Sequence, residues 1–289
     1  MAAPLLITPT LPKLKNVLFA TDFSAGSLAA LPYAGRIARA FGANLHLCHI
    51  EASAPLATGL ADLHLYEAAG KDAVQRLVAL RGLPEIKGLD TALVLAEGDV
   101  KDELLKVVSA ANIDLVVAGT RGRTGLRKML LGSVTEEICR VVTCPILTVG
   151  HEAVYNAEAP FQRILFPTNL SELSKKAGPY IAMLAREFGA PITVLHVLPE
   201  DEATTSDEKS LSESIRRAMS KEFSELAAFQ PEFLVEFGDT AETVLRVARE
   251  KKAGLIAMGI RNAFRPGVLR ERTAYRIIAG AQCPVLTVR

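Results

Sequence analysis

Residues 17–50, VLFATDFSAGSLAALPYAGRIARAFGANLHLCHI, hold the pattern that decides the fold. The apolar segment 16–21 is typical of a strand that is buried on both faces of a parallel sheet. Apolar residues then recur at helical spacing after Ser24, a residue that can cap a helix, until Gly42 ends the pattern. A second apolar segment, 43–50, completes a strand–helix–strand unit.

The same unit occurs a second time. Residues 164–197, ILFPTNLSELSKKAGPYIAMLAREFGAPITVLHV, align with it without a gap, and 14 of the 34 aligned positions are identical. The chain is therefore two copies of one domain. We predict a first domain over 1–150, a short polar linker over 151–162 and a second domain over 163–289.

Strands and helices alternate through both copies, which predicts an α/β fold with parallel sheets and helices on both faces. In the second copy, the charged stretch 200–209 leads into one long helix that ends near Phe229. Asp99 is expected to cap the helix that follows the third strand of the first copy. The expected strands are 16–21, 43–50, 89–96, 113–119 and 145–149 in the first copy, and 163–167, 192–197, 232–237, 255–258 and 284–288 in the second.

The charge balance is close to neutral, with 33 Lys and Arg against 32 Asp and Glu, which argues against a nucleic-acid partner or an acidic membrane surface. No apolar run approaches the roughly 20 residues that span a bilayer, so we expect no membrane segment. The N-terminal segment has no basic residue before its apolar part and is interrupted by prolines, unlike a signal peptide. We expect a cytoplasmic protein.

The 4 cysteines form no C-x-x-C pair, and the 5 histidines show no spacing of the H-x-x-x-H kind. Buried, reduced thiols are the expected role of the cysteines. We therefore expect no metal site made of protein side chains.

Residues 115–135, LVVAGTRGRTGLRKMLLGSVT, suggest where a ligand binds. The apolar run ends in Gly119, Gly122 follows, and Gly132 and Ser133 open a further helix. A strand that leads through a basic, glycine-rich loop to a helix N-terminus is suited to phosphate. If the first and fourth strands are neighbours, Asp22 at the end of the first strand lies in the same crevice as Gly119.

These residue types suit a nucleotide. Asp22 can accept hydrogen bonds from a sugar or base edge, and glycines allow the backbone to approach phosphates. The alternatives are that Asp22 is a helix cap or turn residue, and that Arg121 and its basic neighbours Arg123, Arg127 and Lys128 form a solvated loop. Neither a G-x-x-x-x-G-K-[ST] loop nor a G-x-G-x-x-G loop is present, which argues against a P-loop ATPase, a kinase or an NAD enzyme.

The pattern G-x-x-G, nine residues, then G-[ST] resembles the ATP-binding signature of the universal stress proteins. It is formed here by Gly119, Gly122, Gly132 and Ser133, and the segments TDFS (21–24), CHI (48–50) and CPILTV (144–149) are also similar to that family. The chain thus resembles a tandem universal stress protein. The resemblance implies an open five-stranded parallel sheet of order 3-2-1-4-5 in each copy, and ATP as the ligand, with or without Mg²⁺.

The resemblance also assigns roles to individual residues. It places the base and ribose against residues from the ends of the first two strands, and the phosphates against the loop and helix that follow the fourth strand. The residues concerned are Ala20, Thr21, Asp22 and Ile50 on the adenosine side, Gly119, Arg121 and Gly122 along the ribose and phosphates, and Gly132, Ser133, Val134 and Thr135 as the phosphate cradle.

The second copy departs from this signature. Asn169 replaces Asp22, Asn262 replaces Gly122, and Glu271 and Arg272 replace Gly132 and Ser133. A carboxylate at a phosphate position is unfavourable, and a side chain obstructs close backbone approach. We predict that the second copy does not bind ATP in this manner; Arg261, Arg265 and Arg270 are expected to be surface charge, with another anion as the alternative.

The leading hypothesis is a stress-response protein whose first domain binds ATP and whose nucleotide state regulates contacts with an unknown protein partner. The alternatives are a nucleotide-independent interaction module and a slow ATPase. No catalytic residue is singled out, because Glu136 and Glu137 suit the helix dipole. The apolar edge segments 146–149 and 285–288 predict that the copies pair as an intramolecular pseudo-dimer, and leave a homodimer as a further possibility.

Overall fold

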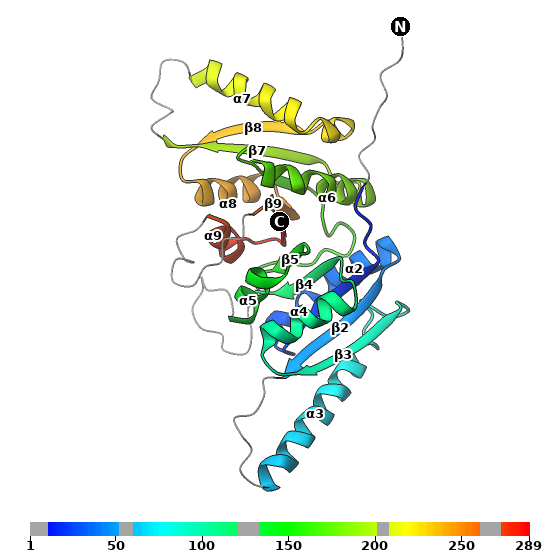
Figure 1. The fold of residues 1–289 in the computed structure, drawn as a ribbon. Helices are drawn as coiled ribbons and strands as arrows, with labels where there is room; N and C mark the ends of the chain where they lie inside the picture. Colours follow the sequence, from blue (N-terminus) through cyan, green and yellow to red (C-terminus); the bar gives the residue numbers. More distant parts are fainter. Residues whose placement is uncertain (1–10, 52–59, 121–132, 201–207, 261–272) are drawn as a thin grey trace. The chain divides into compact units, whose positions relative to one another are not determined.

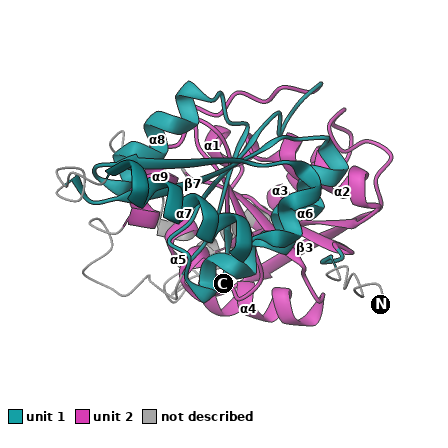
Figure 2. Ribbon diagram, turned by 90° about the horizontal axis from the view of Figure 1, so that it is seen from above, with its two compact units in different colours: residues 1–13, 158–261, 287–289 teal, residues 14–157, 262–286 magenta. Residues whose placement is uncertain are grey.

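The structure is a computed structural model, and it describes residues 11–51, 60–120, 133–200, 208–260 and 273–289 (Figure 1). The chain divides into two compact units, which Figure 2 shows in different colours. The larger unit comprises residues 14–157 and 262–286, and the smaller unit comprises 1–13, 158–261 and 287–289. Residues 262–286 of the second sequence copy therefore belong to the unit built mainly from the first copy.

The larger unit contains a parallel sheet with the strand order β3-β2-β1-β4-β5. This is the predicted order 3-2-1-4-5, and the predicted α/β class is confirmed. The strands are β1 (Asn16–Ala20), β2 (Asn44–Glu51), β3 (Thr91–Glu97), β4 (Leu115–Gly119) and β5 (Ile146–Val149). The helices are α1 (Ala25–Leu28), α2 (Leu31–Phe41), α3 (Leu60–Leu80), α4 (Val100–Ala110), α5 (Ser133–Val141) and, from the second copy, α9 (Thr273–Gly280).

The core of this unit is centred on β1 and β4. Val17, Leu18 and Phe19 of β1 have no exposed surface, and all residues of β4 are buried. A strand with both faces covered needs apolar residues at successive positions, which explains the uninterrupted runs in the sequence. Asp99 caps α4 as expected, and Gly42 ends α2 in the left-handed conformation with φ of 61°.

The single helix expected between Ser24 and Phe41 is two helices. α1 and α2 are separated at Ala29 and Ala30, where the amide of Ala30 bonds to the carbonyl of Ser27 instead of continuing the α-helical pattern. Pro32, in the first turn of α2, has no amide hydrogen for the preceding turn. The aligned Pro179 lies inside the uninterrupted α6, so the proline permits the break without requiring it.

The prediction of a sheet of five strands is wrong for the larger unit, because part of a sixth strand belongs to it. β10 (Val285–Val288) follows β5 in the strand order, and Val285 and Leu286 belong to this unit. The hydroxyl of the fully buried Thr148 donates to the carbonyl of Val285 at 3.2 Å. The edge of β5 is therefore covered by a strand from the end of the chain, which removes an exposed apolar edge.

The smaller unit repeats the plan. The strands β6 (Ile164–Pro167), β7 (Ile192–Leu198), β8 (Glu232–Phe237) and β9 (Leu255–Gly259) lie in the order β9-β6-β7-β8, and the amide of Ile260 donates to the carbonyl of Val288 at 2.7 Å. The long helix expected to end near Phe229 is α7 (Glu208–Glu222) followed by the 3-10 helix η2 (Ser224–Phe229). The remaining helices are α6 (Glu172–Phe188) and α8 (Thr240–Glu250).

Candidate functional site

The strand order reverses between β1 and β4. From β1 the sheet continues to β2 and β3 on one side, and from β4 to β5 on the other. Ala20 at the end of β1 is opposite Ala118, one residue before the end of β4. Ligands of open parallel sheets bind beyond the carboxyl ends of the strands at such a switch point. The fold therefore brings the predicted residues Thr21 and Asp22 next to Gly119.

Thr21 anchors the loop that follows β1. Its amide donates to the carbonyl of Cys48 at 2.9 Å, which extends the pairing with β2. Its hydroxyl lies 2.9 Å from the Ser27 hydroxyl and accepts a hydrogen bond from the amide of Phe23 at 2.9 Å. Its carbonyl lies 2.8 Å from Nδ1 of His49. Because Thr21, Ser27 and His49 are buried, these bonds define the path of the loop that carries Asp22.

Asp22 is half-buried and takes part in the turn that leads into α1. Its Oδ1 accepts a hydrogen bond from the amide of Ser24 at 3.0 Å, the bond that Asp side chains commonly make to the backbone two residues on. The cap of α1 is Ser24, whose hydroxyl accepts from the amide of Ser27 at 3.1 Å. The turn role considered for Asp22 is therefore present, while the helix-cap role belongs to Ser24.

Phe23 extends the polar loop with an aromatic contact. It adopts a left-handed backbone with φ of 62°, which is uncommon for a large side chain. Its ring lies 4.5 Å from the ring of His49, centroid to centroid, and the guanidinium of Arg76 lies 5.6 Å above it. Arg76 also pairs with Asp72 at 2.7 Å, so α3 places a cation beside the loop after β1.

Gly119 is the point where three elements meet. A Cβ at this position would overlap the carbonyl oxygen of Gly26 and would lie 2.7 Å from the Cα of Ser27. The buried hydroxyl of Thr135, in the first turn of α5, donates to the carbonyl of Gly119 at 2.5 Å. The end of β4, the start of α1 and the N-terminus of α5 therefore converge on one residue that has no side chain. The missing side chain lets α1 pack against the end of β4, and a helix N-terminus at this place suits a phosphate-bearing ligand.

The other predicted site residues are only partly described. Ile50 lies near the end of β2, half-buried and opposite Ala96 of β3. Ser133 and Val134 are the first two residues of α5. Arg121, Gly122 and Gly132 lie outside the described residues, as do Arg123, Arg127 and Lys128. The roles assigned to all of these residues stay predictions.

The loop after β6 in the second copy repeats the hydrogen bonds of the loop after β1. The amide of Thr168 donates to the carbonyl of Leu195 at 2.8 Å, and its carbonyl lies 2.8 Å from Nδ1 of His196. Its hydroxyl accepts from the amide of Leu170 at 3.0 Å, and Leu170 has φ of 58°. The threonine and histidine shared by the two copies are therefore the residues that shape this loop.

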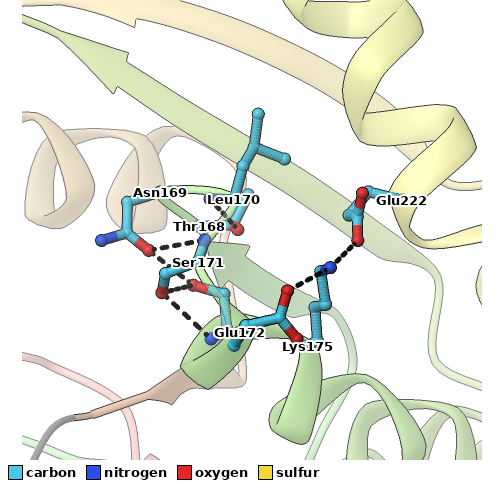
Figure 3. A network of polar contacts seen from close by, with 8 residues as sticks. Thr168, Asn169, Leu170, Ser171, Glu172, Lys175 and Glu222 are labelled. Atoms are coloured by element: carbon cyan, nitrogen blue, oxygen red, sulfur yellow. Dashed lines mark hydrogen bonds and ion pairs between the residues drawn. The ribbon is translucent and has the colours of Figure 1, made fainter.

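Asn169, in the place of Asp22, is bonded differently (Figure 3). Its Oδ1 accepts from the amide of Ser171 at 3.2 Å and from the hydroxyl of Ser174 at 2.8 Å. In the first copy the aligned hydroxyl, that of Ser27, donates to the carbonyl of Ser24 at 3.0 Å. The side-chain oxygen of Asn169 thus binds its own loop twice, and the remaining amide group can only donate. The second copy offers a donor where the first offers a carboxylate.

The fourth strand of the second copy shows a further loss. A Cβ at Gly259 would overlap the carbonyl of Leu173, so the close approach is retained. Ala274, aligned with Thr135, has no hydroxyl to donate to Gly259. Asn262, Glu271 and Arg272 lie outside the described residues, together with Arg261, Arg265 and Arg270.

Figure 3 also shows an ion-pair link with no counterpart in the first copy. Lys175 donates to Glu172 at 2.6 Å and pairs with Glu222 of α7. These hydrogen bonds raise the pKa of Lys175 to about 12. The aligned residue of the first copy is Leu28, so this link is a structural feature of α6 and α7 and not part of the shared site.

The remaining chemistry of the described residues is limited. Burial raises the pKa of Cys48 to about 12, which makes its thiol a poor nucleophile. All four cysteines lie among the described residues, where none forms a disulfide and three are buried. In the ranges that the structure describes, no group of three or more His, Cys, Asp or Glu side chains could hold a metal ion. No helix in those ranges combines the length and apolar character needed to cross a bilayer.

Sequence reasoning missed several residues that build the site. It did not place Ser27 against Thr21, Gly26 beneath Gly119, or Arg76 above Phe23, and it assigned Thr135 to phosphate without its bond to Gly119. Ser27 and His49 could have been found, because they are identical in both copies at Ser174 and His196. Arg76 carries no such signal.

Comparison with known proteins identifies the family. The model of the universal stress protein family matches residues 13–150 and 160–289. A universal stress protein of Methanocaldococcus jannaschii is 30% identical over 141 residues, which cover 47% of this chain and 81% of that protein. A universal stress protein of Mycolicibacterium smegmatis is 25% identical over 296 residues, which cover 95% of this chain and 97% of that protein.

The fold comparison agrees. The crystal structure of a universal stress protein from Archaeoglobus fulgidus superimposes with a TM-score of 0.71 at 22% identity, covering 95% of this chain and 98% of that one. At this identity the likeness concerns the fold alone. Together with the two family matches, which span nearly the whole sequence, these findings show that the chain belongs to the universal stress protein family.

Proposed function

We propose that the first sequence copy binds ATP at the switch point between β1 and β4, and that the second copy does not. The observation that carries this proposal is the junction at Gly119, where a backbone without a side chain meets Gly26 and the N-terminus of α5. A helix N-terminus suits phosphates, and the neighbouring carboxylate of Asp22 suits a ribose or base. Mg²⁺ would accompany the phosphates as counter-ion without needing a protein ligand.

The difference between the copies supports one nucleotide per chain. Asp22 becomes Asn169, whose oxygen already accepts two hydrogen bonds within its own loop. Thr135 becomes Ala274, and the hydroxyl that fastens α5 to Gly119 is lost. The first change removes a negative charge beside the proposed site, and the second removes a buried bond that positions α5. The backbone of the loop is kept, so the change from Asp22 to Asn169 concerns ligand chemistry more than folding.

Asp22→Asn tests this proposal most directly. Asparagine keeps the oxygen that accepts from Ser24, so the turn survives, but the charge is lost. A charge-assisted hydrogen bond is worth about 1.5–3 kcal/mol, so we expect ATP affinity to fall at least about 10-fold in isothermal titration calorimetry. Asn169→Ala is the matched control and should leave the titration unchanged. The proposal fails if the wild-type chain gives no ATP binding, or if Asp22→Asn binds ATP as the wild type does.

We further propose that bound ATP regulates contacts with a protein partner, and that the two copies pair through β5 and β10 within the chain. The bond from Thr148 to Val285 in the larger unit supports the pairing. A slow ATPase is the second candidate. Phosphate release above background that disappears in Asp22→Asn would favour it over simple binding.

A further inference from the structure

The outer edge of the larger unit's sheet is unusually apolar. β3 is the last strand in the order β3-β2-β1-β4-β5, with α3 beside it (Figure 1). Within the part of the chain that the structure describes, four of the five exposed large apolar side chains lie between residues 74 and 95: Val74 (44% exposed), Val78 (50%), Leu83 (37%) and Leu95 (38%). A long apolar edge strand presents unpaired backbone groups and invites another strand.

The corresponding edge in the smaller unit is protected. β8 carries Glu232 and Glu236, which pair with Lys251 at 2.6 Å and with Arg246 at 2.8 Å. Charged side chains on an edge strand are the usual device against pairing. β3 reads Thr-Ala-Leu-Val-Leu-Ala-Glu and has its single charge at the last position, Glu97. The copies therefore share a fold but not this protection.

The backbone of β3 shows which groups are available for pairing. The amide of Leu45 donates to the carbonyl of Asp90, and the amide of Gly98 donates to the carbonyl of Glu51, so the even-numbered residues point their polar groups toward β2. Polar groups alternate in direction along a strand. The amides and carbonyls of Thr91, Leu93, Leu95 and Glu97 therefore point away from the sheet.

The sequence of β3 selects the partner. Residues 92–96, Ala-Leu-Val-Leu-Ala, read the same in both directions. In an antiparallel pair with a two-fold axis at Val94, Leu93 faces Leu95 of the partner subunit, and the outward polar groups of these two residues form a hydrogen-bonded pair. A two-fold interface requires a surface that complements itself, and the symmetric sequence of this strand meets that requirement. We propose that β3 is a homodimer interface, formed by antiparallel pairing with β3 of a second copy of this chain.

This pairing makes a closed dimer. An isologous contact uses the same surface on both chains and leaves no second copy of that surface free, so it does not propagate into fibres. The apolar side chains of Leu93 and Leu95 face their own kind across the pair, and such cross-strand pairs stabilise a sheet. The proposal is independent of nucleotide binding, because β3 contributes no residue to the site at Gly119.

A cysteine at the axis tests both the partner and the register. Residues in a non-hydrogen-bonded antiparallel pair have Cα atoms about 4.5 Å apart, within the range of a disulfide. Val94→Cys in the full-length chain should therefore form an oxidised species of twice the 31.0 kDa of one chain on a non-reducing gel. Leu95→Cys is the matched control, since its two sulfurs would belong to residues about 8 Å apart and should not link.

A charge pair supplies a second test without cysteine. Leu95→Lys should convert a dimer into a monomer in sedimentation velocity, and adding Leu93→Glu should restore the dimer, because position 93 faces position 95 of the partner subunit. Val154→Lys, at a side chain 87% exposed in the linker, adds the same charge elsewhere and should leave the dimer intact. A wild-type chain that stays monomeric at about 100 µM, far above the Kd of a specific complex, would overturn the proposal and leave β3 for a strand of another protein. A wild-type dimer in which Val94→Cys does not link would also overturn it, because the contact would then lie elsewhere.

Discussion

At the scale of single residues, the candidate site depends on glycines that have no side chain and on threonines that hydrogen-bond to the backbone. Gly119 and Gly259 both end a fourth strand, and a Cβ at either would overlap a carbonyl oxygen from the helix that follows the first strand of its copy. Thr21 and Thr168 make the same three bonds in the two loops. The two copies therefore share these backbone contacts, and they differ at Asp22 and Asn169 and at Thr135 and Ala274.

Gly119→Ala should destabilise the protein. The added methyl meets the backbone of Gly26 and Ser27, which cannot give way as a flexible side chain could, and overpacking of this kind costs about 1–3 kcal/mol. Urea unfolding should show a lower midpoint with an unchanged slope. Gly82→Ala is the control, because its nearest neighbour would lie at an ordinary 3.4 Å and the midpoint should hardly move. Equal stability of the two variants would show that the junction is loose.

At the scale of elements, helix α2 buries a titratable group, the phenol of Tyr33. Burial raises the pKa of Tyr33 to about 12, with smaller contributions from Cys283 and Tyr155. The ring is 2% exposed and packs edge-on against Tyr155 at 4.9 Å between centroids. The phenol is thus held neutral in the folded state at a pH where the unfolded chain would ionise it.

The sign of the pH effect follows from linkage. The unfolded phenol has a pKa of 10.0 and the folded one about 12, so the folded chain keeps a proton that the unfolded chain releases between these values. The contribution of Tyr33 to stability is therefore complete below pH 10 and is lost as the pH rises, by about 1 kcal/mol at pH 11. Tyr33→Phe should reduce the fall in unfolding free energy between pH 10 and 11 in chemical unfolding, and should leave the part that comes from the buried Cys48 thiol. Tyr180→Phe, at the aligned position, keeps the Tyr33 phenol and should retain the fall.

At the scale of the whole molecule, a segment near the end of the sequence is part of the unit that the first copy builds. Residues 262–286 belong to the larger unit, and β5 is followed there by the start of β10. The link is direct, because the hydroxyl of Thr148 donates to the carbonyl of Val285, 137 positions later. This closes the apolar edge of β5, whereas β3 at the other edge of the same unit stays exposed.

Thr148→Val measures how much the hydrogen bond from Thr148 to Val285 stabilises the protein. Valine keeps the shape of the buried threonine but cannot donate to Val285, and losing one buried hydrogen bond costs about 1 kcal/mol. The melting temperature of the full chain should fall by a few degrees. An unchanged melting temperature would mean that the carbonyl of Val285 is satisfied without Thr148. Val154→Ala, at a side chain 87% exposed in the linker, removes no side-chain hydrogen bond and is the control.

The sequence by itself determined the parts that depend on neighbouring residues. Continuous apolar runs predicted β1 and β4, and Ser24 and Asp99 predicted caps. The alternation of strands and helices predicted the α/β class, and the resemblance to the universal stress proteins implied the strand order. Asp22 and Gly119 could be assigned to one crevice, because parallel strands end at the same edge of a sheet. These features reflect local periodicity, capping and strand direction, all of which are written in short stretches of sequence.

Only the tertiary structure decided the parts that depend on distant residues. No local pattern predicts three of the observed contacts. These are Val285 beside β5, Gly119 against Gly26, and Arg76 above Phe23. The break between α1 and α2 is of the same kind, since the same proline is tolerated inside α6. Such contacts are chosen by packing between segments far apart in sequence, where close fit and hydrogen bonding outweigh local propensity.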